Sequence, residues 1–255
     1  MKLLEKLYAE KAVGYKGGIY HKLQIDFAYN SNHIEGSRLT HDQTRYIYET
    51  RTIGADAGTV IRVNDIIETV NHFRCFDHIL DTVSEPLTEE YIKNLHRLLK
   101  SGVLDVDAVI GAYKQEENMV GETETALPEE VADRMKKLLV AYDKPTLTFY
   151  EIAAFHTEYE RIHPFYDGNG RTGRLLMFKQ CLANGIVPFF IDEFHKLYYY
   201  LGLKEWQTEN KDERLISVFL SAQHDMKSLM DYFKLDYDHT ELKYKDVLAQ
   251  ARKNC

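Results

Sequence analysis

Apolar side chains recur every three or four residues over most of this chain, the spacing that places them on one face of an α-helix. Residues 60–80 show the pattern, with Ile66, Val70, Phe73 and Ile79 near one face. The same spacing predicts further helices near 192–207, near 212–233 and in the final stretch. We therefore expect an all-α fold.

Residues with known capping preferences mark the ends of several of these helices. Thr88 stands before two glutamates, and Thr148 and Glu151 have the spacing of a capping box. Pro128 suits the first turn of a helix, where its missing N–H costs nothing. The Asn-Gly pair at 184–185 is a common helix stop. These signals predict three helix starts and one helix end.

One segment departs from the helical pattern. Residues 113–128 alternate polar and apolar side chains around Gly121, which is typical of a short β-hairpin or of an extended loop. No repeat and no linker divides the chain. The sequence therefore predicts a single helical domain with one small β-hairpin.

Composition and charge narrow the classes of protein that fit. The 255 residues are 44% apolar and 28% charged, and the net charge of −8 disfavours non-specific binding to nucleic acid or membranes. Three cysteines without a CxxC spacing indicate neither a disulfide framework nor a zinc site. The first residues lack the apolar segment of a signal peptide, and no apolar run can span a bilayer. We expect a soluble, cytoplasmic protein with no nucleic-acid or membrane partner.

The densest chemistry lies in the stretch RIHPFYDGNGRTGRLL. Gly168, Asn169 and Gly170 let backbone N–H groups converge into a nest for phosphate oxygens. Arg171 and Arg174 follow on a new helix, whose N-terminus attracts anions and whose guanidinium groups can bind phosphate in a bidentate way. This order of residues favours a polyphosphate ligand.

Two other residues of the same stretch point to a reaction, and a third indicates how the loop is held. Asp167 beside phosphates suggests Mg²⁺, which prefers one or two carboxylates together with phosphate oxygens and water. His163 is the only residue of the stretch that can act as a general base near neutral pH. Phe165 is the one strongly apolar side chain in the loop and is expected to anchor the loop in the core. Each residue alone is more often structural, but their combination favours a catalytic site.

The segment HPFYDGNGRTGR matches the signature of the Fic family, and the chain resembles that family over roughly residues 25–225. Members of this family typically transfer AMP from ATP to a Ser, Thr or Tyr hydroxyl of a target protein. FHTEYERIHPF is similar to the helix that leads into the family's active loop. The resemblance implies the Fic fold, with N-terminal helices over 1–112, a catalytic core over 113–225 and a helical tail over 226–255.

The resemblance also implies a role for each polar residue of the loop. His163 would deprotonate the incoming hydroxyl, which attacks the α-phosphorus, and Asp167 would hold Mg²⁺ on the α- and β-phosphates. Arg171 would grip the β-phosphate, and Arg174 would reach the γ-phosphate. Charge on the α-phosphate would be stabilised in the transition state by Asn169 and the backbones of Gly168 and Gly170.

Two further assignments rest on position within the family. The flap that aligns a target segment falls on Val120, Gly121, Glu122 and Thr123. An exposed hairpin without function is the competing interpretation. The segment LYYYLGLKEWQ lies where the family builds its adenine pocket, which assigns adenine contacts to Tyr199, Tyr200 and Gln207. Packing in a helical core is the alternative for both tyrosines, and the glutamine stands where the family has an asparagine.

The stretch SNHIEGSRLT carries a second motif. Ser31 and Glu35 lie four residues apart, so they share one face of a helix that would end at Gly36. A carboxylate at a helix C-terminus is unfavourable unless a cation lies near it. The alternative interpretation is that Glu35 is a solvated glutamate on the surface. The stretch is similar to the family's inhibitory motif, whose glutamate pairs with the second arginine of the signature, here Arg174. The resemblance therefore implies intramolecular inhibition.

Taken together, the sequence favours an Mg²⁺-dependent protein adenylyltransferase that uses ATP, is autoinhibited, and modifies itself as well as a protein target. Two alternatives stay open. One is a Fic-like enzyme that moves another phosphate-containing group or removes AMP, and the other is an inactive nucleotide-binding regulatory module. The target, the type of hydroxyl and the oligomeric state, a homo-oligomer included, are also open.

Overall fold

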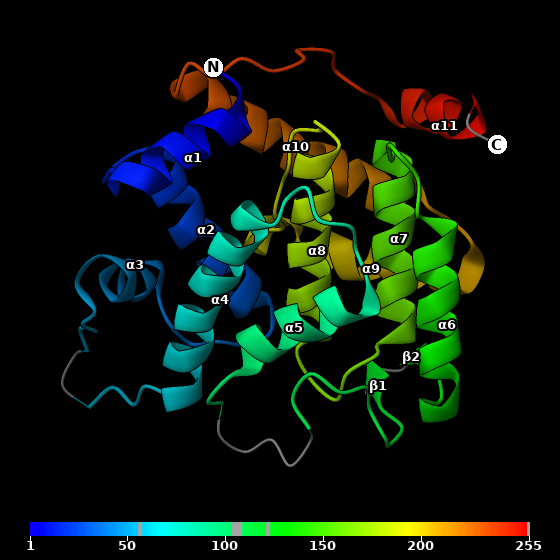
Figure 1. Ribbon diagram of the computed structural model, residues 1–255, viewed down its shortest axis with the longest axis horizontal. Coiled ribbons are helices and arrows are strands. Elements are labelled where there is room, and N and C mark those ends of the chain that lie inside the picture. Colours follow the sequence, from blue (N-terminus) through cyan, green and yellow to red (C-terminus); the bar gives the residue numbers. More distant parts are fainter. Residues whose placement is uncertain (56–57, 104–108, 121–122, 254–255) are drawn as a thin grey trace.

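The computed structural model describes residues 1–55, 58–103, 109–120 and 123–253, whose regular secondary structure is almost entirely helical. The helices are α1 (Leu3–Val13), α2 (Ile19–Ile34), α3 (His41–Thr50), α4 (Val63–Asp81), α5 (Glu89–Lys100), α6 (Pro128–Ala141), α7 (Phe149–Ile162), α8 (Asn169–Ala183), α9 (Glu193–Glu209), α10 (Glu213–Tyr232) and α11 (Tyr244–Lys253) (Figure 1). The predicted all-α class is confirmed. Over the described ranges, no helix combines the length and the apolarity needed to cross a membrane.

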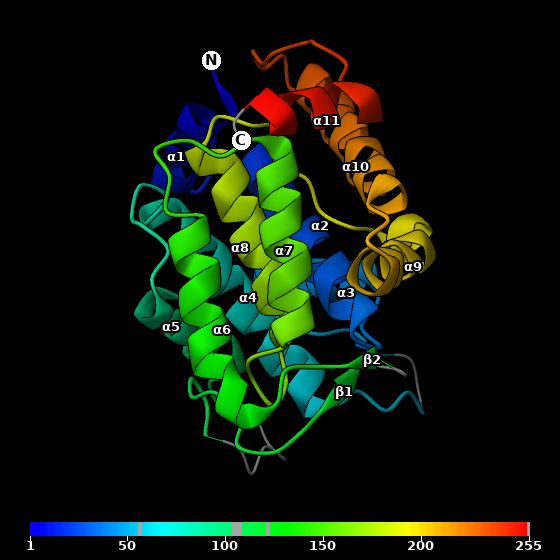
Figure 2. The ribbon, with the colours of Figure 1, turned by 90° about the vertical axis from the view of Figure 1, so that its right-hand side faces the viewer.

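Two short strands lie in the segment that departs from the helical pattern. β1 (Met119–Val120) and β2 (Thr123–Glu124) pair antiparallel, with Val120 opposite Thr123. Gly121 and Glu122, which were assigned to the flap, lie outside the described residues. Figures 1 and 2 show both strands at the end of the molecule where α6 begins and α7 ends.

Local hydrogen bonds decide where several helices begin, as their capping residues predicted. The Thr88 hydroxyl accepts a hydrogen bond from the N–H of Tyr91 (3.0 Å) at the start of α5. Thr148 and Glu151 form the capping box of α7. Pro128 is the first residue of α6. Each cap satisfies or removes an N–H that would otherwise have no partner at a helix start.

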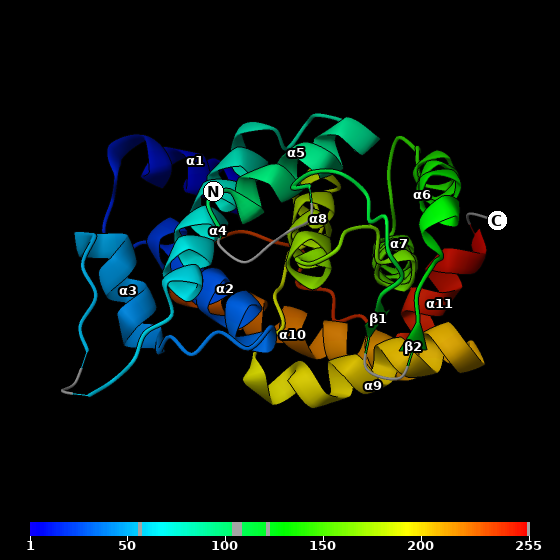
Figure 3. The same cartoon turned by 90° about the horizontal axis from the view of Figure 1, so that it is seen from below.

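Helix α8 lies at the centre of the molecule, with α7 on one side and α2, α4 and α5 on the other (Figures 1 and 3). It is buried along nearly its whole length, from Asn169 to Leu182. A helix buried on all sides has no polar face, so its sequence is not clearly amphipathic. The arginines near its start are consequently inside the protein rather than on its surface.

The N-terminal helices share the main hydrophobic core with α8. Phe27 of α2 packs on Phe178 of α8 with ring centroids 5.0 Å apart, and Phe76 of α4 packs on the same ring at 5.4 Å. All three rings are fully buried. This packing, which removes large apolar areas from water, places the C-terminal end of α2 beside the start of α8.

Candidate active site

The loop between α7 and α8 and the first turns of α8 carry the signature residues. His163 follows α7 in the left-handed conformation (φ +51°), and its N–H donates to the carbonyl of Tyr159 (3.0 Å). Gly168 precedes α8 with φ +80°, and a Cβ atom there would lie 3.2 Å from Cδ of Lys100. Glycine is therefore favoured at this position by its conformation, and a Cβ atom would also crowd the Lys100 side chain.

Phe165 anchors the loop in the core, as its apolar character predicted. Its ring is fully buried and stacks on the imidazole of His96, with centroids 3.8 Å apart. The side-chain amide of Asn169 donates to the Phe165 carbonyl (2.7 Å), and its oxygen accepts from the Phe165 N–H (2.8 Å). The Asn169 side chain thus shapes the loop, while its backbone N–H belongs to the first turn of α8, which has no intrahelical partners.

His96 of α5 connects the loop to its surroundings, and nothing in the sequence pattern marked it. Its Nδ1 accepts from the N–H of Gly111 (3.0 Å), so Nε2 carries the proton and donates to the carbonyl of Asp167 (2.9 Å). Burial lowers the pKa of His96 to about 4, which keeps the ring neutral. His96 therefore supports the loop through Nε2 and through the face of its ring, while Nδ1 connects it to Gly111.

His163, the predicted general base, is partly buried at the start of the loop. Burial, and then the positive charge of Lys114, lower the pKa of His163 to about 4. The imidazole is therefore neutral near pH 7 and able to accept a proton. Its Nδ1 has no hydrogen-bond partner within the described ranges.

Asp167, the predicted metal ligand, lies beside two cations. Its Oδ2 is 2.5 Å from Nζ of Lys100 and 3.5 Å from Nη2 of Arg171. Partial burial works to raise the pKa of this carboxyl, but Arg171 and Lys100 outweigh it, so the pKa is lowered and the group is ionised. The side chain is 51% exposed. An ionised, accessible carboxylate beside a phosphate nest fits Mg²⁺.

Glu68 of α4 joins both cations that flank Asp167. Its Oε2 lies 2.5 Å from Nη1 of Arg171, and its other oxygen contacts Nζ of Lys100. Arg171 is 4% exposed and Lys100 is 2% exposed, so these charges depend on their partners inside the protein. The sequence did not predict Glu68 or Lys100, because each lies in a helical pattern far upstream of the loop without a motif around it.

The motif at the end of α2 holds Arg174, whose side chain is 1% exposed. Nη2 of Arg174 lies 2.7 Å from Oε1 of Glu35 and donates to the carbonyl of Ser31 at 2.9 Å, while Nε donates to the Ser31 hydroxyl at 3.1 Å. Burial works to raise the pKa of Glu35, but Arg174 and Arg171 outweigh it and lower the pKa. Helix α2 ends just before Glu35, and Gly36 has φ +90°, as the motif predicted.

The Glu35 carboxylate also lies against the loop. A Cβ atom at Gly170 would be 2.3 Å from Oε1 of Glu35 and 3.0 Å from Nη1 of Arg174. Glu35 is therefore at the first turn of α8, where the N–H groups that suit a phosphate are found.

The base of the two strands is tied to the same loop. The Asn118 amide donates to the carbonyl of Phe165 (3.1 Å), and the N–H of Lys114 donates to the carbonyl of Pro164 (2.9 Å). Nζ of Lys114 donates in turn to Asn118 (2.6 Å) and to Thr125 (2.7 Å). These bonds fix the strands relative to His163 and its neighbours.

The three residues assigned to adenine do not converge on one site. Tyr199 is 1% exposed in the core formed by α7, α9 and α10, so for this tyrosine the core-packing alternative describes what is seen. Tyr200 is 38% exposed, and its hydroxyl reaches the carbonyl of Ile34 at 3.5 Å. Gln207 donates to the carbonyl of Thr157 (3.1 Å) and borders a cavity that contains no loop residue.

Comparison with known proteins places this site in a family. Residues 86–181 match the model of the Fic/DOC family. Proteins named protein adenylyltransferase Fic are 31% identical in Nematostella vectensis and 32% identical in Drosophila erecta, each over 180 residues. The matched regions cover 68% and 69% of this chain, and 42% and 36% of those relatives, so the chain spans less than half of their length.

A solved structure supports the same assignment. The crystal structure of a Fic domain containing signaling protein from Bacteroides thetaiotaomicron has a TM-score of 0.73 and 25% identity. It covers 92% of this chain and 99% of its own. With the complete signature at the junction of α7 and α8, these matches show that the chain belongs to the Fic/DOC family.

Proposed function

We propose that this protein transfers AMP from ATP to a hydroxyl group of a protein side chain. The observation that carries the proposal is the arrangement around the first turn of α8: a neutral His163, an ionised Asp167 and two buried arginines. The name that the relatives carry supports this class of reaction.

In this reaction the oxygen of the target hydroxyl attacks the α-phosphorus. The new O–P bond forms as the bond to the pyrophosphate oxygen breaks, and the imidazole of His163 takes the hydroxyl proton. Backbone N–H groups at Gly168, Asn169 and Gly170 hold the α-phosphate oxygens while negative charge builds on them. Mg²⁺, held by Asp167, would neutralise the phosphates and the leaving pyrophosphate.

The remaining cations are assigned to the outer phosphates. Arg171 binds the β-phosphate after exchanging part of its contact with Glu68 and Asp167, and Arg174 binds the γ-phosphate. Tyr200, half-exposed near the end of α2, is the residue we assign to the base.

The contact between Glu35 and Arg174 is assigned an inhibitory role. Arg174 cannot bind the γ-phosphate while Glu35 and Ser31 hold it, and the Glu35 carboxylate repels phosphate from the first turn of α8. ATP then binds with its α-phosphate turned away from in-line attack. A preference of about 2–3 kcal/mol for this arrangement lowers the competent population roughly 30- to 150-fold. Weak transfer, mostly onto the protein itself, follows.

The target is proposed to dock along the two short strands. An extended segment of the target would add to the strand edge through main-chain hydrogen bonds. The flap residues are Val120, Gly121, Glu122 and Thr123. Because Lys114 and Asn118 tie this element to the loop, a docked hydroxyl would lie near His163. Backbone pairing does not select the target side chain.

Labelled ATP distinguishes this reaction from its alternatives. The Glu35→Gly protein is incubated with Mg²⁺ and ATP labelled at the α- or the γ-phosphate, and label on protein is measured. We expect label from the α-phosphate only, and about 10²–10⁴-fold less in the matched Glu35→Gly/His163→Ala protein. Label from the γ-phosphate would show kinase activity. Label from neither position, with ATP still bound, would indicate a regulatory nucleotide-binding module instead.

A further inference from the structure

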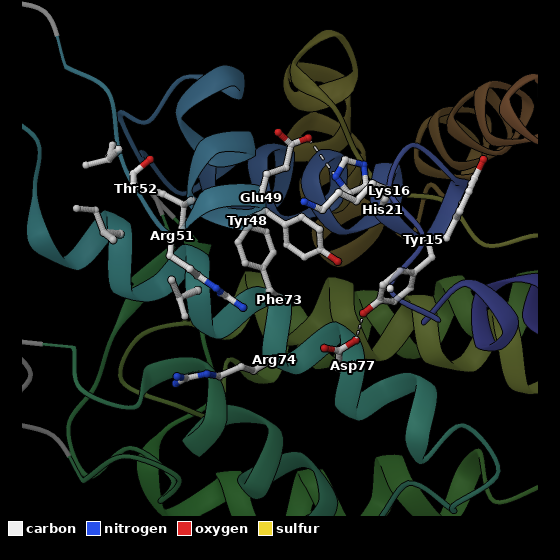
Figure 4. Close-up of a pocket in the computed structure, with 16 residues that line it drawn as sticks. Tyr15, Lys16, His21, Tyr48, Glu49, Arg51, Thr52, Phe73, Arg74 and Asp77 are labelled. Carbon is white, nitrogen blue, oxygen red and sulfur yellow. Dashed lines mark hydrogen bonds and ion pairs between the residues drawn. The ribbon is translucent and has the colours of Figure 1, made fainter. Parts of the chain in front are cut away.

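A second candidate site lies away from the active loop. A cavity of about 710 Å³ opens between the turn after α1, the end of α3 and one side of α4 (Figure 4). None of the signature residues lines it. Its volume is typical of sites that bind small molecules. Two of its walls come from α2 and α4, the helices that bring Glu35 and Glu68 to the signature arginines.

The acidic groups of this cavity already have partners within the protein. Asp77 accepts a hydrogen bond from the hydroxyl of Tyr20 (2.5 Å). Glu49 lies 3.1 Å from Nε2 of His21 and 3.5 Å from Nη1 of Arg45. These carboxylates are therefore accounted for by internal contacts and do not require a cationic ligand.

The arginines of the cavity differ in this respect. Arg74 donates to the neutral amide of Asn71 (3.2 Å), and across the described ranges neither Arg74 nor Arg51 forms an ion pair with a carboxylate. Figure 4 shows both arginines on one side of Phe73 and Asp77 on the other. Two exposed guanidinium groups at one end of a cavity create a local positive potential that attracts an anion.

Aromatic rings line the cavity beside these charges. Phe73 is 4% exposed and meets the edge of Tyr48, with ring centroids 4.9 Å apart. Tyr48 in turn meets His21 at 5.3 Å. The rings thus hold one another in place and offer an apolar wall to a flat ligand.

We propose that this cavity binds a small aromatic compound that carries a phosphate group. The phosphate would be held by Arg51 and Arg74, since a doubly charged oxyanion matches two guanidinium groups. The ring would pack against Tyr48 and Phe73. Nucleoside monophosphates and simple aryl phosphates share this chemistry. The proposal does not depend on AMP transfer, because none of its residues belongs to the signature loop.

Calorimetric titration of the whole chain tests the site, with phenyl phosphate as the probe. Inorganic phosphate carries the charge without the ring, and benzyl alcohol carries the ring without the charge. Phenyl phosphate is expected to bind at least about tenfold more tightly than either, because only it engages both the arginines and the rings. A second titration uses AMP. Binding of AMP through the same arginines would extend the ligands of this cavity to nucleotides. Failure of AMP to bind would restrict the ligands to smaller aryl phosphates.

Two double variants decide where the probe binds. Arg51→Ala/Arg74→Ala is expected to weaken phenyl phosphate at least about tenfold. Arg62→Ala/Lys136→Ala makes the same change of net charge at exposed positions outside the cavity, and should leave affinity unchanged. Equal affinity in the two double variants, or phenyl phosphate binding no tighter than inorganic phosphate, would overturn the proposal.

Discussion

Nη2 of Arg174 lies 2.7 Å from the carboxylate of Glu35, although 139 positions separate the two residues in the chain. The contact joins the end of α2 to the first turn of α8. It also places a negative charge at the first turn of α8, where we propose that phosphate binds. A ligand that needs Arg174 must compete with Glu35, so the strength of this contact should govern activity.

The hydroxyl of Ser31 makes a smaller contribution to the same contact. Ser31→Ala removes the bond to Nε of Arg174 but leaves the carbonyl of residue 31 and the Glu35 carboxylate in place. One hydrogen bond is worth about 0.5–1.5 kcal/mol, so AMP transfer should rise about two- to tenfold. Ser228→Ala, at a serine whose hydroxyl donates to the carbonyl of His224 one turn earlier in α10, is the control and should not change the rate. A Ser31→Ala protein less active than wild type would contradict the supporting role of this hydroxyl.

Phe165 is expected to stabilise the fold as well as the loop. Phe165→Ala removes a fully buried ring that stacks on His96, so the free energy of unfolding should fall by about 3–5 kcal/mol. Tyr166→Ala, at the next residue, removes a ring that is 52% exposed and should cost less than about 1 kcal/mol. Urea denaturation of both variants measures the difference, and similar losses would show that the loop is not anchored through Phe165.

Asp167→Asn should separate metal binding from the shape of the loop. Asparagine keeps the volume of the side chain but removes the charge, so Mg²⁺ should no longer strengthen ATP binding. Transfer should fall at least about 10²-fold. The measurement is calorimetric titration of ATP with and without Mg²⁺, in proteins that also carry Glu35→Gly. Asp143→Asn, at an exposed aspartate, is the control. Mg²⁺-dependent ATP binding that survives in the Asp167→Asn protein would exclude this carboxylate as the metal ligand.

The pH dependence of transfer reports on His163. Because burial lowers the pKa of His163 to about 4, the neutral, proton-accepting form should predominate throughout pH 6–8. The rate in a Glu35→Gly protein should therefore stay level over that range and fall only as the pH approaches 4. A profile that drops by half near pH 6.5, the ordinary histidine value, would show that the imidazole is solvated in the active state.

The parts of the fold that follow from local sequence were predictable, and the parts set by distant packing were not. Thr88, Pro128 and the Thr148–Glu151 pair act on N–H groups within one helical turn, so their effect can be inferred from a few neighbouring residues. The roles of Phe165 and Gly36 could be inferred for the same reason.

Residues brought to the site by other helices carried no such signal. Glu68 and Lys100 approach the loop only because α4 and α5 pack on α8, and His96 is recognisable only by what it stacks on. For Tyr199 the sequence left core packing and adenine contact both open, since which side of a helix turns inward is decided by tertiary packing, and this side chain is buried in the core. Ser31 and Glu35 could be found because they form a motif, whereas their partner could be identified only through the family resemblance.

We propose that Glu35 restrains a competent catalytic loop. This inhibitory role is tested by comparing wild type, Glu35→Gly and Glu35→Gly/His163→Ala in one assay with α-labelled ATP and Mg²⁺. Glu35→Gly is expected to transfer label at least about tenfold faster than wild type, and the double variant is expected to lose this gain. Equal rates for wild type and Glu35→Gly would contradict the inhibitory role of Glu35. An active double variant would show that transfer does not pass through His163.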